Sequence, residues 1–263
     1  MDSRTQSATT ATTRASGTAV TALLARDSRG VLVRAVLPVL VVAAVAWTMT
    51  VRGTGGAMGM TAVAYVAAWV LMMVAMMLPA VAPVVGLYAL AARRGVVAAV
   101  PVFVAGYLLV WAVSGVPAYV VSLAVSDSLM AGEPWVARLT GVTLLAAAAY
   151  QLTPIKAMCL RHCRSPMTFF LSRRGGLSRP RAAFTAGAGH GLYCLGCCWA
   201  LMAVLIVLGG MQLGWALALT VVIALEKLAP WGAAVARGSA AVAGVLGVAL
   251  IASPPLLQPL IRI

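Results

Sequence analysis

Long apolar runs, separated by short segments that carry arginine, glycine or proline, make up most of this sequence. About 20 apolar residues in a helix cross the hydrocarbon core of a bilayer, and seven runs approach or exceed that length. Pro79 and Pro83 predict that the second run ends or bends there. The Pro254-Pro255 pair permits a re-entrant last run, which would leave six full spans. The predicted spans are approximately residues 35–51, 60–78, 96–125, 135–155, 182–209, 212–228 and 239–261.

Composition places the chain among integral membrane proteins. Of its 263 residues, 63% are hydrophobic and 9% are charged, and the mean hydropathy is +1.02. A soluble domain of this length needs far more charge on its surface. We therefore predict an all-α fold, a polytopic bundle of transmembrane helices, with residues 31–263 forming a single domain in the lipid bilayer.

The basic residues indicate how the chain is oriented in its membrane. The formal charge is +14, but the bases lie between the apolar runs and form no groove or stripe, which argues against nucleic-acid binding. With seven spans, sixteen bases fall on the side of the N-terminus and three, Arg52, Arg138 and Arg262, on the other. Loops rich in lysine and arginine stay in the cytosol. This predicts a multi-pass protein of the inner (cytoplasmic) membrane with its N-terminus inside, and residues 1–30 as a disordered basic cytosolic tail.

A histidine and three cysteines lie close together in the fifth run. In a helix, His190, Cys194 and Cys198 fall at i, i+4 and i+8 and share one face, with Cys197 beside them. Buried cysteine is common packing material, but three cysteines within five positions beside a histidine indicate a soft-metal or redox site. The five cysteines of the chain all lie in two short clusters, which argues against a disulphide scaffold.

Further candidate ligands lie in the second and fourth runs. The second run carries four methionines, although methionine also fills irregular gaps in helices, so packing is the competing interpretation. A Cys-Leu-Arg-His-Cys motif at the end of the fourth run predicts a second, shallower metal site, or alternatively a basic juxtamembrane helix attracted to anionic lipid. These candidates are Met72, Met73, Met76 and Met77 in the second run, and Cys159, His162 and Cys163 after the fourth.

Glu226 is an acid near the interior of a predicted span, where a carboxylate needs a partner or a role. Its neighbour Lys227 projects about 100° away on a helix, so the two need not pair. At a rise of about 1.5 Å per residue, Glu226 lies at nearly the depth of His190. The sequence leaves three roles open for Glu226: a metal ligand or proton acceptor, an outer partner of His190, and a structural charge at a helix interface.

These stretches resemble a bacterial family, domain of unknown function 2182, whose members are predicted metal-binding integral membrane proteins. The resemblance covers about residues 60 to 232 and implies metal binding without specifying an activity. It rests on Met72-Met-Val-Ala-Met-Met-Leu-Pro79, Tyr150-Gln-Leu-Thr-Pro-Ile-Lys156, Cys159-Leu-Arg-His-Cys-Arg-Ser-Pro166, His190-Gly-Leu-Tyr-Cys-Leu-Gly-Cys-Cys-Trp199 and Glu226-Lys227.

Two functions fit these residues. The first is transport or delivery of a soft cation, with copper as the expected metal, by way of the methionines, the His190 face and the shallower Cys159 motif. Its partner would be a cytosolic or periplasmic metallochaperone or an apo-metalloprotein. The second is a membrane thiol-disulphide oxidoreductase that passes electrons through Cys194 and Cys197. The second leaves Cys198 and both histidines without a role, so a non-enzymatic function is the favoured expectation.

Overall fold

The computed structural model of this protein describes residues 29–53, 60–92, 96–164, 179–208 and 212–256. Within these segments every regular element is a helix, which confirms the predicted all-α class. The predicted tail, residues 1–30, lies almost entirely outside the described residues. The helices are Arg29–Arg52, α2 (Ala62–Ala92), α3 (Val96–Ala131), α4 (Pro134–Gln151), α5 (Pro154–Arg164), α7 (Pro180–Val207), α8 (Leu213–Leu228) and α9 (Gly232–Ala252), then the 3-10 turn η1 (Pro254–Leu256).

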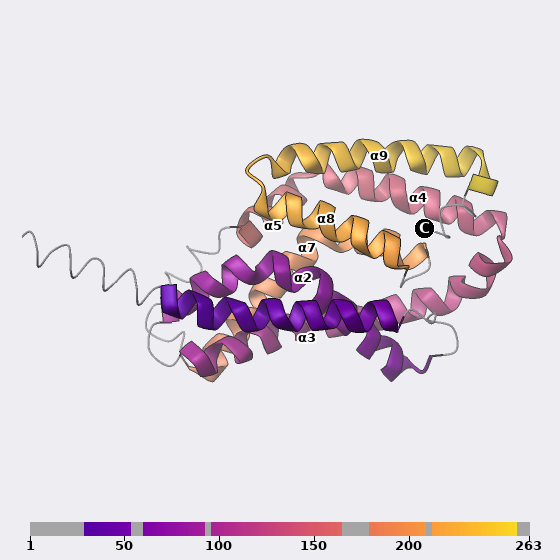
Figure 1. Cartoon of the computed structure of the whole chain (residues 1–263). Coiled ribbons are helices and arrows are strands. Elements are labelled where there is room, and N and C mark those ends of the chain that lie inside the picture. The colour runs from indigo at the N-terminus through magenta and orange to yellow at the C-terminus, as the bar shows by residue number, and fades with distance from the viewer. Residues whose placement is uncertain (1–28, 54–59, 93–95, 165–178, 209–211, 257–263) are drawn as a thin grey trace, which may run out of the picture.

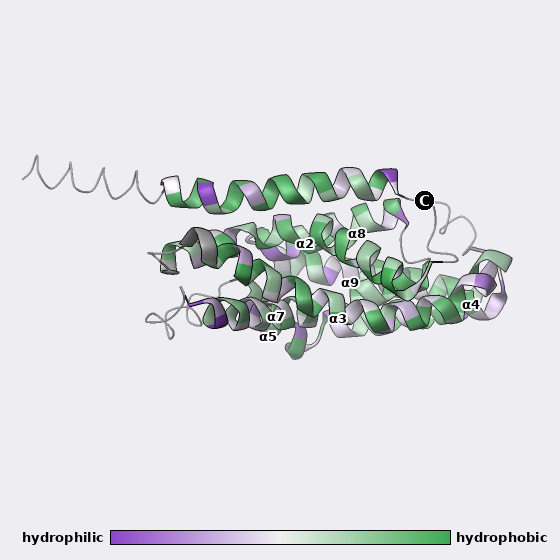
Figure 2. Cartoon of the chain, turned by 90° about the horizontal axis from the view of Figure 1, so that it is seen from below, coloured by the Kyte–Doolittle hydropathy of each residue, from purple (hydrophilic) through white to green (hydrophobic). Residues whose placement is uncertain are grey.

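The described part of the chain has five helices that are long and apolar enough to cross a membrane, or six if α4 and α5 together form one bent span. The sequence predicted seven. The difference comes from α8, whose 16 residues reach about 24 Å and fall short of a hydrocarbon core of about 30 Å. Large apolar side chains such as those of Val113, Val120 and Val245 remain exposed, as expected for helices that face lipid. Most of the helical ribbon is hydrophobic (Figure 2).

Two proline-based predictions differ from the structure. α2 continues through Pro79 and Pro83 to residue 92 instead of ending there. Proline is tolerated inside a membrane helix when neighbouring groups satisfy the carbonyls that it frees. The last long helix, α9, begins at Gly232, seven residues before the predicted 239, and ends before Pro254. It is continuous and long enough to span, so the re-entrant alternative is not the one observed.

The predicted fourth span is broken instead. α4 ends at Gln151 and α5 starts at Pro154 with a bend of 67° between the two helices. Proline at the first position of a helix is favourable, and the Oγ1 of Thr153 caps α5 by accepting a hydrogen bond from the backbone N–H of Lys156 at 3.2 Å. The break turns α5, with its two cysteines, away from the axis of α4.

α7 is the helix around which the bundle is packed. It contacts α3, α5 and α4, while α9 lies along α4 and α8 lies between α9 and α2 (Figure 1). Two glycines allow the backbones of α3 and α7 to touch. A Cβ on Gly187 would lie 1.9 Å from the Phe103 carbonyl oxygen, and a Cβ on Gly106 would lie 2.2 Å from that of Phe184. This close approach presents the cysteine face of α7 to α3.

Candidate metal centre

The sulphur of Cys194 lies at the centre of a group of side chains from five helices, which we call the Cys194 cluster. Cys194 is fully buried on α7. Its Sγ lies 3.0 Å from the hydroxyl of Tyr107 on α3 and accepts a hydrogen bond from the Nζ of Lys227 on α8, also at 3.0 Å. The same ammonium lies 3.8 Å from the Sδ of Met77 on α2. The remaining members are Cys163 on α5 and His190, Cys197 and Cys198 on α7.

The other donors approach Cys194 from α5 and from α7 itself. The Sγ of Cys163 lies 3.9 Å from Nε2 of His190, and the Cys163 thiol also lies beside that of Cys194. The thiols of Cys197 and Cys198 donate to the Cys194 carbonyl oxygen at 3.1 Å and 2.9 Å. All four cysteines and His190 are buried, so the predicted face of α7 points into the bundle.

The methionines of α2 are all buried, and Met77 is the one whose sulphur reaches the cluster through Lys227. Met77 lies one turn beyond Met72 and Met73, still within the run that the sequence predicted as the second span.

The structure divides the Cys159, His162, Cys163 motif. Cys163 is buried and joins the Cys194 cluster, whereas Cys159 is half-buried beside Gly196 of α7. His162 is exposed, and its ring stacks on Tyr193 with the centroids 4.6 Å apart. The three side chains of the motif therefore lie on different sides of α5 and do not face one point.

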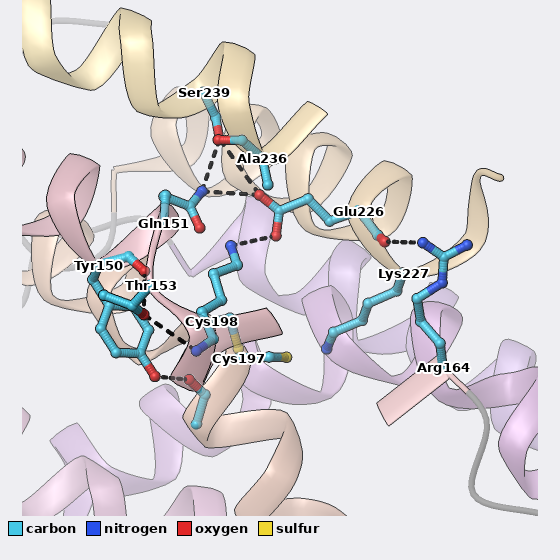
Figure 3. A network of polar contacts seen from close by, with 12 residues as sticks. Tyr150, Gln151, Thr153, Arg164, Cys197, Cys198, Glu226, Lys227, Ala236 and Ser239 are labelled. Carbon is cyan, nitrogen blue, oxygen red and sulfur yellow. Dashed lines mark hydrogen bonds and ion pairs between the residues drawn. The ribbon is translucent and has the colours of Figure 1, made fainter. Parts of the chain in front are cut away.

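Glu226 belongs to a second buried network, shown in Figure 3. Its Oε2 pairs with Nζ of Lys156 at 2.6 Å, and its Oε1 accepts from Nε2 of Gln151 at 2.9 Å and from Ser239 at 3.4 Å. The pairing with His190 that was one of the expectations is thus replaced by a pairing with Lys156. Lys227 projects from another side of α8, as its spacing predicted.

The Glu226 network holds α5 against α8. Lys156 lies at the start of α5, and Arg164 at its end donates to the Glu226 and Ala229 carbonyl oxygens at 3.3 Å and 2.7 Å. α5 is therefore fixed at both ends, and Cys163 lies between the two attachment points.

Sequence reasoning missed Gln151 and Ser239 of the Glu226 network, and also Tyr107, Lys156 and Lys227. Tyr107 lies in an apolar run without any nearby signal. Lys156 and Lys227 are the two lysines of the chain, and both lie at edges of apolar runs, where the sequence indicated topology. Both are buried in the structure, 1% and 6% exposed. The signal that could have identified Lys227 is its position directly beside Glu226, the acid within an apolar run.

Within the described residues, no three His, Cys, Asp or Glu side chains are arranged to hold a metal ion together. The donors nevertheless have the chemistry of a soft site, since thiol, thioether and imidazole surround Cys194 and the nearby carboxylate is occupied by Lys156. A metal ion bound in this cluster would therefore require a rearrangement of side chains. The rearrangement would include Lys227, whose Nζ contacts the sulphurs of Cys194 and Met77.

Comparison with known proteins adds a family. The sequence model of PpoB2, described as a copper chaperone, matches residues 66–250, a segment that contains both buried networks. No curated protein and no solved structure shows significant similarity to the chain.

Proposed function

Because this chain belongs to the PpoB2 copper chaperone family, we propose that it binds Cu(I) at the Cys194 cluster inside the membrane and delivers the ion to a protein partner. The observation that carries the proposal is the convergence of sulphur and nitrogen donors from three helices. Met77 of α2, Cys163 of α5 and the α7 pair His190 and Cys194 meet in one buried place.

The donor set favours a soft ion. Thiolate and thioether select Cu(I), whereas Mg²⁺ and Ca²⁺ require oxygen ligands. The carboxylate of Glu226 is engaged by Lys156, Gln151 and Ser239 and supplies no such oxygen. Typical metal–sulphur and metal–nitrogen bonds add up to about 4.3 Å, so the 3.9 Å between Cys163 and His190 is already within reach of one bridging ion.

Delivery is supported by the different exposure of three donor side chains on α5. Cys163 is buried in the cluster, Cys159 one turn earlier is half-buried, and His162 is exposed. An ion that leaves His190 and Cys163 meets these residues next. We propose that α5 is the exit, and that a metallochaperone or an apo-metalloprotein collects copper there.

The proposed orientation follows the bases. The protein would lie in the cytoplasmic membrane with its N-terminus and the connection after α5 in the cytosol, so that α5 faces cytosolic acceptors. The resemblance to domain of unknown function 2182 is consistent with this assignment, because every motif that supports it lies between residues 66 and 250.

The experiment is metal analysis of the purified full chain after loading with Cu(I) under reducing conditions. We expect stoichiometric copper in the wild type, loss of copper in the double variant Cys194→Ser, Cys198→Ser, and retention in the matched control Cys159→Ser. Copper retained by the double variant would contradict the proposal.

Thiol titration before and after reduction tests the alternative function, a thiol-disulphide oxidoreductase. A protein that binds no copper and gains two thiols on reduction would be an oxidoreductase acting through Cys194 and Cys197.

A further inference from the structure

The two lysines of this chain are both buried but have opposite kinds of partner. Lys156 pairs with the carboxylate of Glu226 at 2.6 Å. The Nζ of Lys227 instead contacts two sulphur atoms, Cys194 Sγ at 3.0 Å and Met77 Sδ at 3.8 Å. A buried ammonium normally pairs with an acid, but the adjacent acid Glu226 is paired with Lys156. The Lys227 ammonium therefore contacts two sulphur atoms that belong to the proposed copper ligands.

The distances show that these two sulphur atoms would be shared. Because Lys227 Nζ lies 3.0 Å and 3.8 Å from the two sulphurs, Cys194 Sγ and Met77 Sδ cannot be further apart than the 6.8 Å to which these distances add up. A metal–sulphur bond is about 2.3 Å long. One ion bound by both sulphurs would need them within about 4.6 Å of each other. It would use the same two sulphur atoms that the ammonium now contacts, so the two cations compete for them.

We propose that the Lys227 ammonium is a built-in placeholder cation, which fills the position between the Cys194 and Met77 sulphurs and is displaced when Cu(I) binds. This inference rests on the proposed function, since it assigns Cu(I) to that cluster. It makes Lys227 a positioning residue that tunes binding without contacting the ion.

Charge explains why such a device suits delivery. Cu(I) and an ammonium both carry one positive charge, so exchanging one for the other leaves the charge beside Cys194 unchanged in a medium of low dielectric constant. The empty cluster keeps a cation next to its sulphur. In the copper-loaded cluster the displaced Lys227 ammonium has lost its sulphur partner. An unpaired ammonium inside a membrane is costly, so its return to Cys194 is favoured. Lys227 thus weakens copper binding and helps release.

The test compares Cu(I) affinity, measured by competition with a chromogenic Cu(I) chelator, in the wild type, Lys227→Leu and Lys227→Arg. Leucine removes the cation without adding a sulphur ligand, and arginine keeps the cation. A charge-assisted hydrogen bond lost on binding corresponds to about 10- to 100-fold in affinity. We expect Lys227→Leu to bind Cu(I) tighter by this factor and to release it to excess chelator more slowly, while Lys227→Arg shows no such gain.

A second measurement follows Lys227 in the wild type itself. The chain has two lysines, so protein labelled with ζ-¹⁵N-lysine gives two side-chain ammonium signals. On loading with Cu(I), the signal of Lys227 is expected to move and that of Lys156 to stay, with Lys156→Arg providing the assignment.

The outcomes separate the inference from the function. A wild type that binds no Cu(I) refutes the proposed function. A wild type that binds Cu(I), together with unchanged or weaker binding in folded Lys227→Leu, or with an unmoved Lys227 signal, overturns the placeholder and makes Lys227 a counter-charge that stays in place.

Discussion

Changing Glu226 to glutamine tests whether the buried ion pair fixes α5 in the bundle. Glu226 and Lys156 are 2% and 1% exposed and 2.6 Å apart. Glutamine keeps an oxygen that accepts from Gln151 and Ser239, so the principal loss is the partner of Lys156. Removing one member of a buried pair costs about 3–5 kcal/mol, because the remaining charge is left uncompensated.

That cost is large enough to measure in detergent. For a chain of this size, each kcal/mol lowers Tm by about 2–4 °C, so Glu226→Gln is expected to lower the apparent Tm by about 6–20 °C. The matched control is Glu133→Gln at the start of α4, the same substitution at an exposed acid that makes no side-chain capping bond. We expect the control to stay within about 0.5 kcal/mol of the wild type.

A double-mutant cycle distinguishes a broken pair from general damage. Lys156→Met removes the other charge, and the combination Lys156→Met, Glu226→Gln leaves no unpaired ion, which is often close to neutral for stability. We therefore expect the double variant to be more stable than either single variant. If Glu226→Gln shifts the Tm by less than about 2 °C, or if the two single effects simply add, the ion pair does not hold α5 and the reasoning fails.

Two further predictions concern packing and orientation. Gly187→Ala is expected to lower the Tm by more than about 5 °C or to prevent folding, because its Cβ would lie 1.9 Å from the backbone oxygen of Phe103. The control Gly238→Ala on α9, where nothing lies within 4 Å of the added Cβ, is expected to be neutral or slightly stabilising. Thermal melts of both variants check this, and equal melts would contradict the close contact of α3 and α7. A reporter fused at Phe170, outside the described residues, is expected to report the cytosol because of the excess of bases on that side; a periplasmic signal would invert the orientation and place the α5 exit outside the cell.

The helices were largely predictable because hydrophobicity is a local property of the sequence. α7 and α8 begin and end within two residues of the predicted runs. The errors occur where tertiary contacts decide. α2 continues through two prolines that the sequence indicated as its end, and the predicted fourth span bends at Thr153 because a capped new helix starts at Pro154.

The site was predictable only as far as one helix extends. The spacing of His190, Cys194 and Cys198 predicted a common buried face, which the structure confirms. The partners of that face were not predictable, because they come from distant parts of the chain. Tyr107 lies 87 residues from Cys194, and Lys227 lies 150 residues from Met77. No periodicity connects residues on different helices, so these pairings appear only when the helices are packed.

Adjacent residues of α8 serve the two networks separately. The side chain of Glu226 reaches α4, α5 and α9, and that of Lys227 reaches α7 and α2, because consecutive positions on a helix point about 100° apart. The backbone carbonyl of Glu226 also accepts from Arg164, so the turn that carries Lys227 is the turn to which α5 is attached. The same short stretch of α8 therefore carries both the ammonium that contacts Cys194 and the carbonyl that holds the end of α5. If Cu(I) displaces Lys227 as proposed above, the change occurs directly beside the attachment point of α5.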